Sequence, residues 1–372
     1  MLITRDGDFC QVDFDWRDDD PERPAHDVLV RLIGATDYAH DDGDLTAYLM
    51  ERGDDGVWRL SLRLPAGFRT SYQFCPVRDE PLRGGHPDDD RWAAILTGGH
   101  PDPGHGAGIG PSTWPNYGQA SVLSLPDAPA QPWVEPGGAP CGTLTRHTLG
   151  DSAIWVYAPA VDAAEHALAV LFDGKVWDGI GVTVAFDNLH AAGVIPPTVV
   201  VGVDSIHGLP RNQALTRPGV LRSFLLDELL PFVHKGWPVT ADPARTVLAG
   251  QSLGGLAAVR IGFDHPDRFG RVLTQSGSFW RAADTPDEID SPALFDAYAD
   301  ADRVPLRIFQ EAGSLERTLL TRNRIFHGIL LDRGIPVTYR EYQGGHDYAC
   351  WRGGLADGLI DLLGEPDALP AE

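Results

Sequence analysis

The stretch RTVLAGQSLGGLAAVRIGF runs from Arg245 to Phe263 and contains the pentapeptide GQSLG, residues 250–254. The β-branched, apolar run before this pentapeptide predicts a buried strand, and the run rich in Gly and Ala after it predicts a helix. Ser252 therefore lies on a predicted strand-to-helix turn. In a chain with 42 glycines the pentapeptide alone identifies nothing, but its place on such a turn is typical of a nucleophilic serine.

The glycines of this turn and the helix that follows it have physical roles. A sharp turn brings the backbone so close to its neighbours that a Cβ does not fit at Gly250 or Gly254. The amide of Leu253 then opens the helix, where N–H groups without helical partners stabilise developing negative charge. A second such amide is expected in the loop after an earlier strand. In LFDGKVW the amide of Lys175, just past Gly174, is the candidate.

The second half of the chain alternates short strands with stretches long enough for helices. The predicted strands are β-branched runs that end near Gly, Asp or Pro: AIWVYAP, ALAVLFDG, PTVVVGVDS, RTVLAG, RVLTQSG, PLRIFQEAG and VTYREYQGG. Before the last of them, ERTLLTRNRIFHGILLDRG repeats apolar residues at helical spacing. This alternation predicts an α/β fold with a mostly parallel sheet, covered by helices on both faces. Its chemistry is expected at the carboxyl ends of the strands.

A serine hydroxyl needs a base in contact with it, and chain order indicates the candidate. His346 follows the last predicted strand, downstream of Ser252, which is the order used by hydrolases of this fold. The acid that orients the histidine should follow the penultimate strand, where the sequence offers Glu311 and Glu316. Glu316 is preferred because it lies on the loop beyond the strand. Asp347 is a poorer choice, because adjacent residues rarely direct their side chains at each other.

The first part of the chain has the patterns of β-structure. Candidate strands separated by Gly, Asp and Pro lie at residues 27–34, 45–50, 56–65 and 70–77. In VWRLSLRL polar and apolar residues alternate, which predicts a strand with one wet face in a small β-sandwich. From about Arg78 to Pro140 the chain is dense in Gly, Pro and Asp and predicts a long connecting loop. We therefore divide the chain into an N-terminal domain, residues 1–135, and a catalytic domain, residues 136–372.

Charge and hydropathy exclude several classes of partner. The formal net charge of −23 argues against nucleic acid and anionic membrane surfaces, which carry the same sign. The start, MLITRDGDFCQVDF, has acidic residues where a signal peptide has a basic run and then an apolar one. No run of about 18 apolar residues is present. The expected partner is a small molecule, and the sequence leaves the oligomeric state open.

Histidine and cysteine usage predicts neither a metal site nor disulfides. His86, His100 and His105 lie among aspartates in the predicted loop, but without the spacing of a ligand set. The four cysteines are widely separated and form no CxxC pair: Cys10, Cys75, Cys141 and Cys350. Such thiols are typical of a reducing cytoplasm, where we expect the protein to act.

These motifs together resemble the enterochelin esterase family. In the N-terminal domain and its join the resemblance rests on FDWRD, GVWRLSLRLPAGFRTSYQF and LSLPDAPAQPW. In the second half it rests on LFDGKVW, DELLP, AGQSLGGLAA, HPDRFGRVLTQSGSFW, EAGSLE and GGHDYACWRGGLADGLIDL. The resemblance implies an immunoglobulin-like β-sandwich before an α/β-hydrolase domain, with Ser252 as nucleophile, His346 as base and Glu316 as acid. It also implies a cytoplasmic enzyme that cleaves ester bonds of ferric catecholate trilactones.

The implied substrate is a bulky anion that carries its own iron, so the enzyme itself is expected to need no metal or organic cofactor. Such an anion must be held against a negative background, and arginines make paired hydrogen bonds to its oxygens. Tryptophans of the same segments stack on catechol rings or cover the arginines. Besides Lys175, the candidate substrate contacts at strand ends and in nearby loops are Arg211, Arg281, Arg352, Trp177, Trp280 and Trp351.

One departure from the family pattern concerns substrate choice. After VVVGVDS, family members carry Arg-x-x-Glu-Leu, whereas this chain keeps Arg211 but has Ala214 in place of the glutamate. The departure leaves open which siderophore is cleaved. Two alternatives remain: a general carboxylesterase, feruloyl-type esterase or acyltransferase with the same three residues, and a binding protein for siderophores or carbohydrates whose serine is idle.

Overall fold

The computed structural model describes residues 1–83, 85–106, 108–110 and 118–364, which form two compact units. The first unit comprises Met1–Ala130 and two short segments from much later in the chain, Gly313–Glu316 and Tyr342–Cys350. The rest of the chain from Gln131 onward forms the second unit. The sequence predicts a boundary near residue 135 and no return of the chain to the first unit. The place of the two late segments in the first unit was therefore not predicted from the sequence.

An eight-stranded sheet forms the centre of the second unit. Across the sheet the order is β15 (Val337–Tyr342), β14 (Arg307–Gly313), β13 (Arg271–Gln275), β12 (Thr246–Gln251), β10 (Ala167–Phe172), β11 (Thr198–Ser205), β9 (Ser152–Ala158) and β8 (Thr143–Leu149). The strands from β11 through β10, β12 and β13 to β14 pair in parallel, whereas β9 is antiparallel to β8 and β11. This confirms the predicted mixed α/β sheet and all seven predicted strands. The prediction omits β8, an edge strand of mostly polar residues, none of them fully buried.

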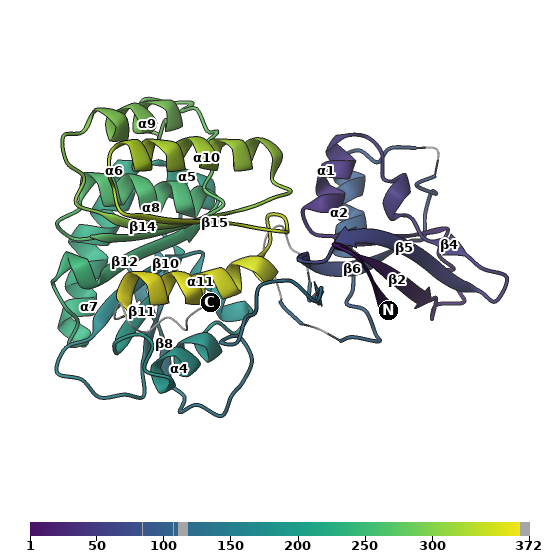
Figure 1. Ribbon diagram of the computed structural model, residues 1–372, viewed down its shortest axis with the longest axis horizontal. Coiled ribbons are helices and arrows are strands. Elements are labelled where there is room, and N and C mark those ends of the chain that lie inside the picture. The colour runs from purple at the N-terminus through teal and green to yellow at the C-terminus, as the bar shows by residue number, and fades with distance from the viewer. Residues whose placement is uncertain (84, 107, 111–117, 365–372) are drawn as a thin grey trace. The chain divides into compact units, whose positions relative to one another are not determined.

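Helices cover this sheet on both faces, as the strand–helix alternation predicts. They are α3 (Gly174–Gly179), α4 (Thr183–Ala191), α5 (Arg211–Thr216), α6 (Pro218–Arg222), the π-helical turn η2 (Ser223–Leu229), α7 (Leu230–Gly236), α8 (Leu253–Asp264), α9 (Ser291–Asp300), α10 (Arg317–Asp332) and α11 (Tyr348–Leu363). Figure 1 shows α8, α9 and α10 on one face of the sheet and α4 and α11 on the other. Each crossover helix returns the chain so that parallel strands end at one edge.

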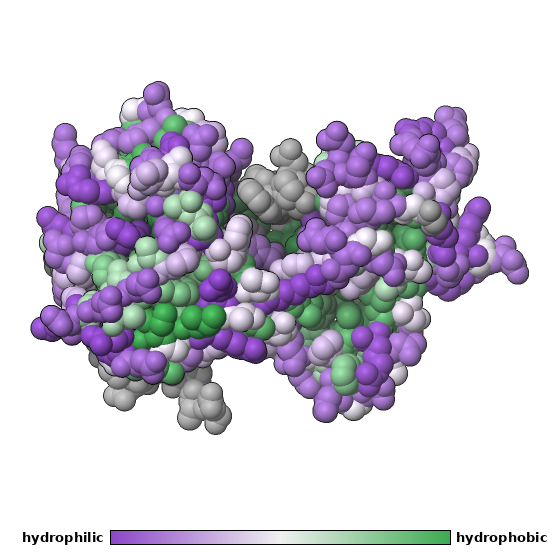
Figure 2. All heavy atoms as spheres, turned by 90° about the horizontal axis from the view of Figure 1, so that it is seen from above, coloured by the Kyte–Doolittle hydropathy of each residue, from purple (hydrophilic) through white to green (hydrophobic). Residues whose placement is uncertain are grey.

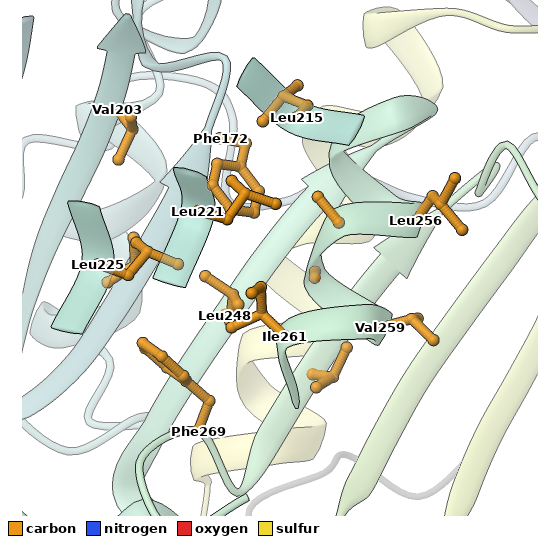
Figure 3. Packing of buried hydrophobic residues seen from close by; sticks show 14 of the residues in the cluster. Phe172, Val203, Leu215, Leu221, Leu225, Leu248, Leu256, Val259, Ile261 and Phe269 are labelled. Atoms are coloured by element: carbon orange, nitrogen blue, oxygen red, sulfur yellow. The ribbon is translucent and has the colours of Figure 1, made fainter. Parts of the chain in front are cut away.

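A buried apolar cluster fixes helix α8 to the sheet. Figure 3 shows its members from β10, β12 and α8, among them Phe172, Leu248 and Leu256, together with side chains of α5, α6 and η2. These three side chains have no solvent exposure. Burying a Leu or Phe side chain contributes about 1.5–3 kcal/mol relative to leaving it in water. The strand-to-helix turn between β12 and α8 is therefore held on both sides by packed elements.

The first unit contains two antiparallel sheets around one apolar cluster. One sheet has the order β1 (Leu2–Asp6), β2 (Phe9–Arg17), β5 (Val57–Pro65), β4 (Glu51–Arg52), and the other has the order β3 (Asp27–Leu32), β6 (Arg69–Val77), β7 (Ser121–Ser124). Side chains of both sheets, including Phe14, Val30 and Phe74, meet in the cluster. These two sheets are consistent with the predicted small β-domain at the N-terminus.

Several local predictions in the first unit are wrong. Residues 45–50 form the 3₁₀ turn η1 (Thr46–Tyr48) and no continuous strand. The predicted connecting loop contains helix α2 (Asp89–Thr97) and strand β7, although residues 84, 107 and 111–117 of it lie outside the described part. A further helix, α1 (Ala35–Asp41), follows β3. The prediction also omits β1 and β2.

The surface reflects the composition. Most of the face shown in Figure 2 is hydrophilic, in keeping with 53 acidic and 30 basic residues. Across the residues that the structure describes, we find no helix with the length and hydropathy needed to cross a bilayer.

Candidate active site

Ser252 occupies the turn between β12 and α8 with an unusual backbone conformation. Its φ is 57° and its ψ is −119°, and Leu253 begins the helix. A positive φ is strained for a residue with a Cβ and is common at catalytic positions. The Ser252 amide donates to the carbonyl of Gln275 at 3.0 Å, which ties the turn to the end of β13. The predicted strand–turn–helix around this serine is therefore present.

The glycines around Ser252 are required by close backbone approaches. A Cβ on Gly250 would lie 2.3 Å from the carbonyl of Gly254, a distance that real Cβ atoms do not adopt. A Cβ on Gly255 would lie 2.6 Å from the Thr274 hydroxyl. At Gly254 the approach is milder, 3.2 Å to the Cβ of Phe172. The predicted steric requirement for glycine is therefore strongest at Gly250.

Ser278 is a neighbour of the nucleophile that the sequence analysis missed. Its hydroxyl lies 3.1 Å from the Ser252 hydroxyl, and its amide donates to the Ser252 carbonyl at 3.0 Å. It lies in QSGSFW, directly after β13. The available signal was the position of a serine at the carboxyl end of the strand beside β12.

Two backbone amides lie at the starts of helices that follow neighbouring strands. Leu253 is the first residue of α8 and Lys175 is the second residue of α3, which follows β10. Within the described part of the chain neither amide donates to a carbonyl. Strands β10 and β12 are parallel neighbours, so both amides lie at the same edge of the sheet. An oxyanion hole requires two N–H donors at one place, and the assignment of these two amides to it stays a prediction.

Arg211 is engaged by the turn that leads into α3. Its guanidinium binds the carboxylate of Asp173 through Nε and through Nη2, the latter at 2.6 Å, and Nη2 also lies 3.4 Å from the carbonyl of Gln251. Asp173 itself has a left-handed conformation with φ 61°. Arg211 therefore supports the two turns more directly than it presents a free charge to substrate. Ala214, at the position of the family glutamate, is buried in the apolar cluster.

Glu316 and His346 form a hydrogen-bonded pair in the two late segments of the first unit. Glu316 Oε1 lies 2.6 Å from His346 Nδ1, and Glu316 Oε2 accepts from the amide of Gly313 at 2.8 Å. The carboxylate is buried, while the imidazole is 27% exposed. This is the arrangement in which a carboxylate fixes the tautomer and the orientation of a histidine.

The other acidic candidates have different partners. Glu311 is buried and binds Gln275 Nε2 at 2.6 Å and Arg340 Nε at 2.7 Å. Burial raises the pKa of its carboxyl, and the Arg340 charge opposes that effect. The carboxylate of Asp347 faces Ser71. Of the three acids considered from the sequence, the structure brings only Glu316 to His346.

The expected substrate contacts differ sharply in exposure. The indole of Trp177 is fully buried and that of Trp351 is 3% exposed, so neither ring presents a face to a ligand and this expectation is wrong for both. Trp280 is 53% exposed. Arg281 pairs with Glu288 and with Asp284.

Lys175 and Arg352 complete the set of expected cationic contacts. The side chain of Lys175 is exposed, whereas Arg352 donates through Nε to Gln131 at 3.1 Å. No cluster of three or more histidine, cysteine or acidic side chains suited to a metal occurs among the described residues. Lys175 and Trp280 are thus the candidates most open to solvent.

Comparisons with known proteins agree with these observations. The family described as "Putative esterase" matches residues 150–362, and the family described as "Enterochelin esterase, N-terminal" matches residues 11–134. The iron(III) enterobactin esterase of Dickeya dadantii is 32% identical over 98% of this chain and 90% of its own. The iron(III) salmochelin esterase of Escherichia coli is 32% identical over 95% of this chain and 88% of its own. A crystal structure of ferric enterobactin esterase from Salmonella typhimurium matches with a TM-score of 0.84 at 32% identity, covering 97% of this chain and 95% of that one.

Proposed function

The chain belongs to the enterochelin esterase family, and from this premise we propose that it hydrolyses the ester bonds of a catecholate trilactone siderophore. The joint match of both parts of the chain carries the proposal. A general carboxylesterase, a feruloyl-type esterase or an acyltransferase accounts for the match over residues 150–362 but not for the match over residues 11–134. The protein is a carboxylic ester hydrolase, and the iron reaches it as part of the substrate.

The reaction proceeds in two acyl-transfer steps that use Ser252, His346 and Glu316 in the chain order Ser–acid–His of this fold. His346 Nε2 takes the hydroxyl proton as Ser252 Oγ attacks the ester carbonyl. The tetrahedral intermediate collapses, the C–O bond of the ester breaks, and the leaving hydroxyl receives the proton from His346. Water then attacks the acyl-enzyme by the same route and releases the acid. Glu316 keeps the proton of the neutral imidazole on Nδ1.

The developing oxyanion is stabilised by the amides of Leu253 and Lys175. Support comes from the position of both at helix starts at one sheet edge, without carbonyl acceptors among the described residues. Removing one donor of such a pair costs about 10²–10³ in kcat in well-studied hydrolases. The Arg211–Asp173 ion pair holds the turn that carries the Lys175 amide. These groups suffice for ester hydrolysis, so the enzyme needs no metal or organic cofactor of its own.

Substrate recognition relies on the exposed candidates. The ferric catecholate is an anion and the chain carries a net charge of −23, so local cations must offset the long-range repulsion. Lys175 supplies a solvent-exposed charge beside the proposed oxyanion amide. Trp280 supplies an exposed ring two residues after Ser278. Arg281 and Arg352 bind other side chains of the protein. They therefore contribute more to the shape of the substrate site than to its positive charge.

The proposal also covers the fold type of each unit and the cellular compartment of the protein. The sheet orders β1-β2-β5-β4 and β3-β6-β7 correspond to strands A-B-E-D and C-F-G of an immunoglobulin-like sandwich. The second unit is an α/β-hydrolase domain. All four cysteines are free thiols, which suits a reducing cytoplasm.

Product analysis by mass spectrometry tests the function. The full chain is incubated with an iron-loaded serine trilactone, with a trithreonine trilactone and with simple aryl esters, in parallel with the variant Ser252→Ala. We expect linear and shorter catechoyl products from the wild type and none from Ser252→Ala. Binding of the substrate to Ser252→Ala should still be measurable as quenching of the protein's fluorescence. If the enzyme instead cleaves aryl esters rapidly and leaves the trilactones intact, it is a general esterase. Binding without cleavage in both proteins would indicate a binding protein.

A further inference from the structure

The carboxylate next to the proposed catalytic histidine is buried against strand β6. Asp347 is 3% exposed, and its Oδ2 accepts from the amide of Ser71 at 2.5 Å. The Ser71 hydroxyl lies 2.8 Å from Oδ1, and the Thr70 hydroxyl lies 3.1 Å from Oδ2. The amide of Ala349 donates to Oδ1 at 2.9 Å. All of these residues belong to the first unit.

The same segment has further contacts on both sides of the histidine. The amide of Arg69 donates to the carbonyl of Gln343 at 2.9 Å, and the amide of Gly67 donates to the Gln343 side chain at 3.1 Å. The thiol of Cys350 lies 3.3 Å from the Arg69 carbonyl. Residues 67–71 therefore hold the segment before and after His346.

Two glycines of this segment allow the close approach. A Cβ on Gly344 would lie 2.8 Å from the carbonyl of Arg69, and a Cβ on Gly345 would lie 3.1 Å from the Cα of Gly34. The chain thus uses glycine at both positions before His346 and an aspartate directly after it. All three features serve contact with the N-terminal part of the chain.

These contacts determine the backbone of the histidine, whereas Glu316 determines only its ring. A buried carboxylate with several donors forms charge-assisted hydrogen bonds, which are about twice as strong as neutral ones. If the carboxylate is removed, the Ser71 amide is left buried without its acceptor, at a cost of about 1–3 kcal/mol. The backbone at residues 346 and 347 is then free to shift, and a displacement of about 1 Å at a reacting group can cost 10²-fold in rate.

We propose that Asp347 is a positioning residue, and that through its bonds to Ser71 and Thr70 the N-terminal β-unit acts as part of the catalytic apparatus. This inference rests on the proposed role of His346 as base. It predicts that the first unit contributes to kcat through the histidine segment, independently of any contact that it makes with the siderophore.

The test compares Asp347→Asn and Ser71→Ala with a matched control in the full-length protein. In Asp347→Asn an N–H₂ group can face the Ser71 amide, so two donors oppose each other. Ser71→Ala removes one donor and leaves the carboxylate its other partners. The control is Asp102→Asn, which changes an equally buried carboxylate of the same unit. Asp102 accepts from Tyr72 and Gly104, which lie outside the histidine segment.

Two readouts separate positioning from general destabilisation. The first is the rate at which a fluorophosphonate labels Ser252, which reports activation of the nucleophile without any siderophore. The second is the division of the effect between kcat and KM for the trilactone. For Asp347→Asn we expect labelling and kcat to fall together by about 10- to 100-fold, with KM within about 2-fold of the wild type. For Ser71→Ala we expect a smaller fall in both.

The inference is overturned if folded Asp347→Asn and Ser71→Ala label at the wild-type rate, or if Asp102→Asn lowers labelling equally. Melting temperatures identify variants that remain folded at the assay temperature, and Ser71→Ala serves if Asp347→Asn does not fold. Failure of the proposed function looks different. The wild type would then be labelled rapidly by the fluorophosphonate while leaving every trilactone intact, and the comparison of labelling rates among the variants would still decide the role of Asp347.

Discussion

The hydroxyl oxygen of Ser278 lies 3.1 Å from that of Ser252, and the amide of Ser278 donates to the carbonyl of the same residue. Ser278 is 2% exposed, so its hydroxyl has little access to water as an alternative partner. In this geometry Ser278 can donate to the nucleophilic oxygen as negative charge develops on it. A hydrogen bond to a charged group contributes about 1.5–3 kcal/mol.

Replacing Ser278 by alanine should therefore lower kcat/KM by about 10-fold or more, since 1.4 kcal/mol corresponds to a factor of ten. The measurement is steady-state hydrolysis of an aryl ester. Ser276→Ala is the matched control, because Ser276 lies in the same loop but its hydroxyl binds the indole of Trp351. Unchanged or increased activity in Ser278→Ala would contradict a supporting role for this hydroxyl.

Glu316→Gln should reduce kcat by about 10⁴-fold, the loss seen when the acid of a Ser–His–acid triad becomes an amide. The amide can donate to His346 Nδ1 and so favours the tautomer that cannot accept the serine proton on Nε2. Pre-steady-state acylation with an aryl ester measures the effect. Glu311→Gln provides the contrast. It disturbs the buried pair with Arg340 and should lower the free energy of unfolding, while the folded fraction keeps its acylation rate within about 10-fold.

The elbow and the sheet could be predicted because their signals are local. A β-branched run followed by glycines and a helix specifies the turn at Ser252, and seven short apolar runs specify seven strands. In the first unit the sequence analysis omitted β2, although Cys10, Val12, Phe14 and Trp16 alternate along it and all four side chains are buried. Strand β8 had no comparable signal, because an edge strand of polar residues resembles a loop.

The parts of the site that could not be predicted depend on contacts between distant residues. Ser278 was missed because no local pattern distinguishes a serine that contacts Ser252 from one that faces water. Trp177 and Trp351 were expected to contact the substrate because their segments contain functional residues, yet apolar area favours burying their rings. Asp347 was considered only as a partner of its neighbour, whereas its partner Ser71 lies 276 positions earlier in the chain.

Gly250→Ala should be strongly destabilising, by about 2–4 kcal/mol, because a Cβ there would lie 2.3 Å from the Gly254 carbonyl and either the strand or the helix must move. Gly328→Ala carries the same chemical change in the interior of α10, where nothing lies within 4 Å of the added Cβ. That control should stabilise the protein by about 0.5–1 kcal/mol. Urea denaturation measures both, and similar effects at the two sites would refute the steric argument.

Asp204 should make stability depend on pH in the opposite sense to most carboxylates. Burial, with help from Asp178, raises its pKa to about 6, and its Oδ1 is buried without a hydrogen-bond partner among the described residues. Because the folded protein holds this proton more tightly than the unfolded chain, the contribution to stability is present below about pH 4 and is lost as the pH rises through 6. Asp204→Asn should thus gain about 1 kcal/mol at pH 8, a value reduced for solvent screening at this partly exposed group.

Urea titrations of the wild type and Asp204→Asn at pH 5 and pH 8 measure this difference. At pH 5 most Asp204 is protonated in the folded protein, so the two proteins should differ little there. A gain of the same size at both pH values would indicate better packing of the amide and not the removal of a buried charge.

Trp280 should affect the binding of the substrate and not the stability of the fold. Its indole is 53% exposed, so truncation should leave the melting temperature within about 1 °C, while stacking on a catechol ring contributes about 0.5–1.5 kcal/mol. Trp280→Ala should therefore raise KM for the iron-loaded trilactone about 3- to 10-fold with kcat nearly unchanged, and Trp280→Phe should recover most of the loss. Leu331→Ala, which removes a side chain of similar exposure from α10, is the control. An equal rise in KM for Leu331→Ala, or none for Trp280→Ala, would show that this tryptophan does not contact the substrate.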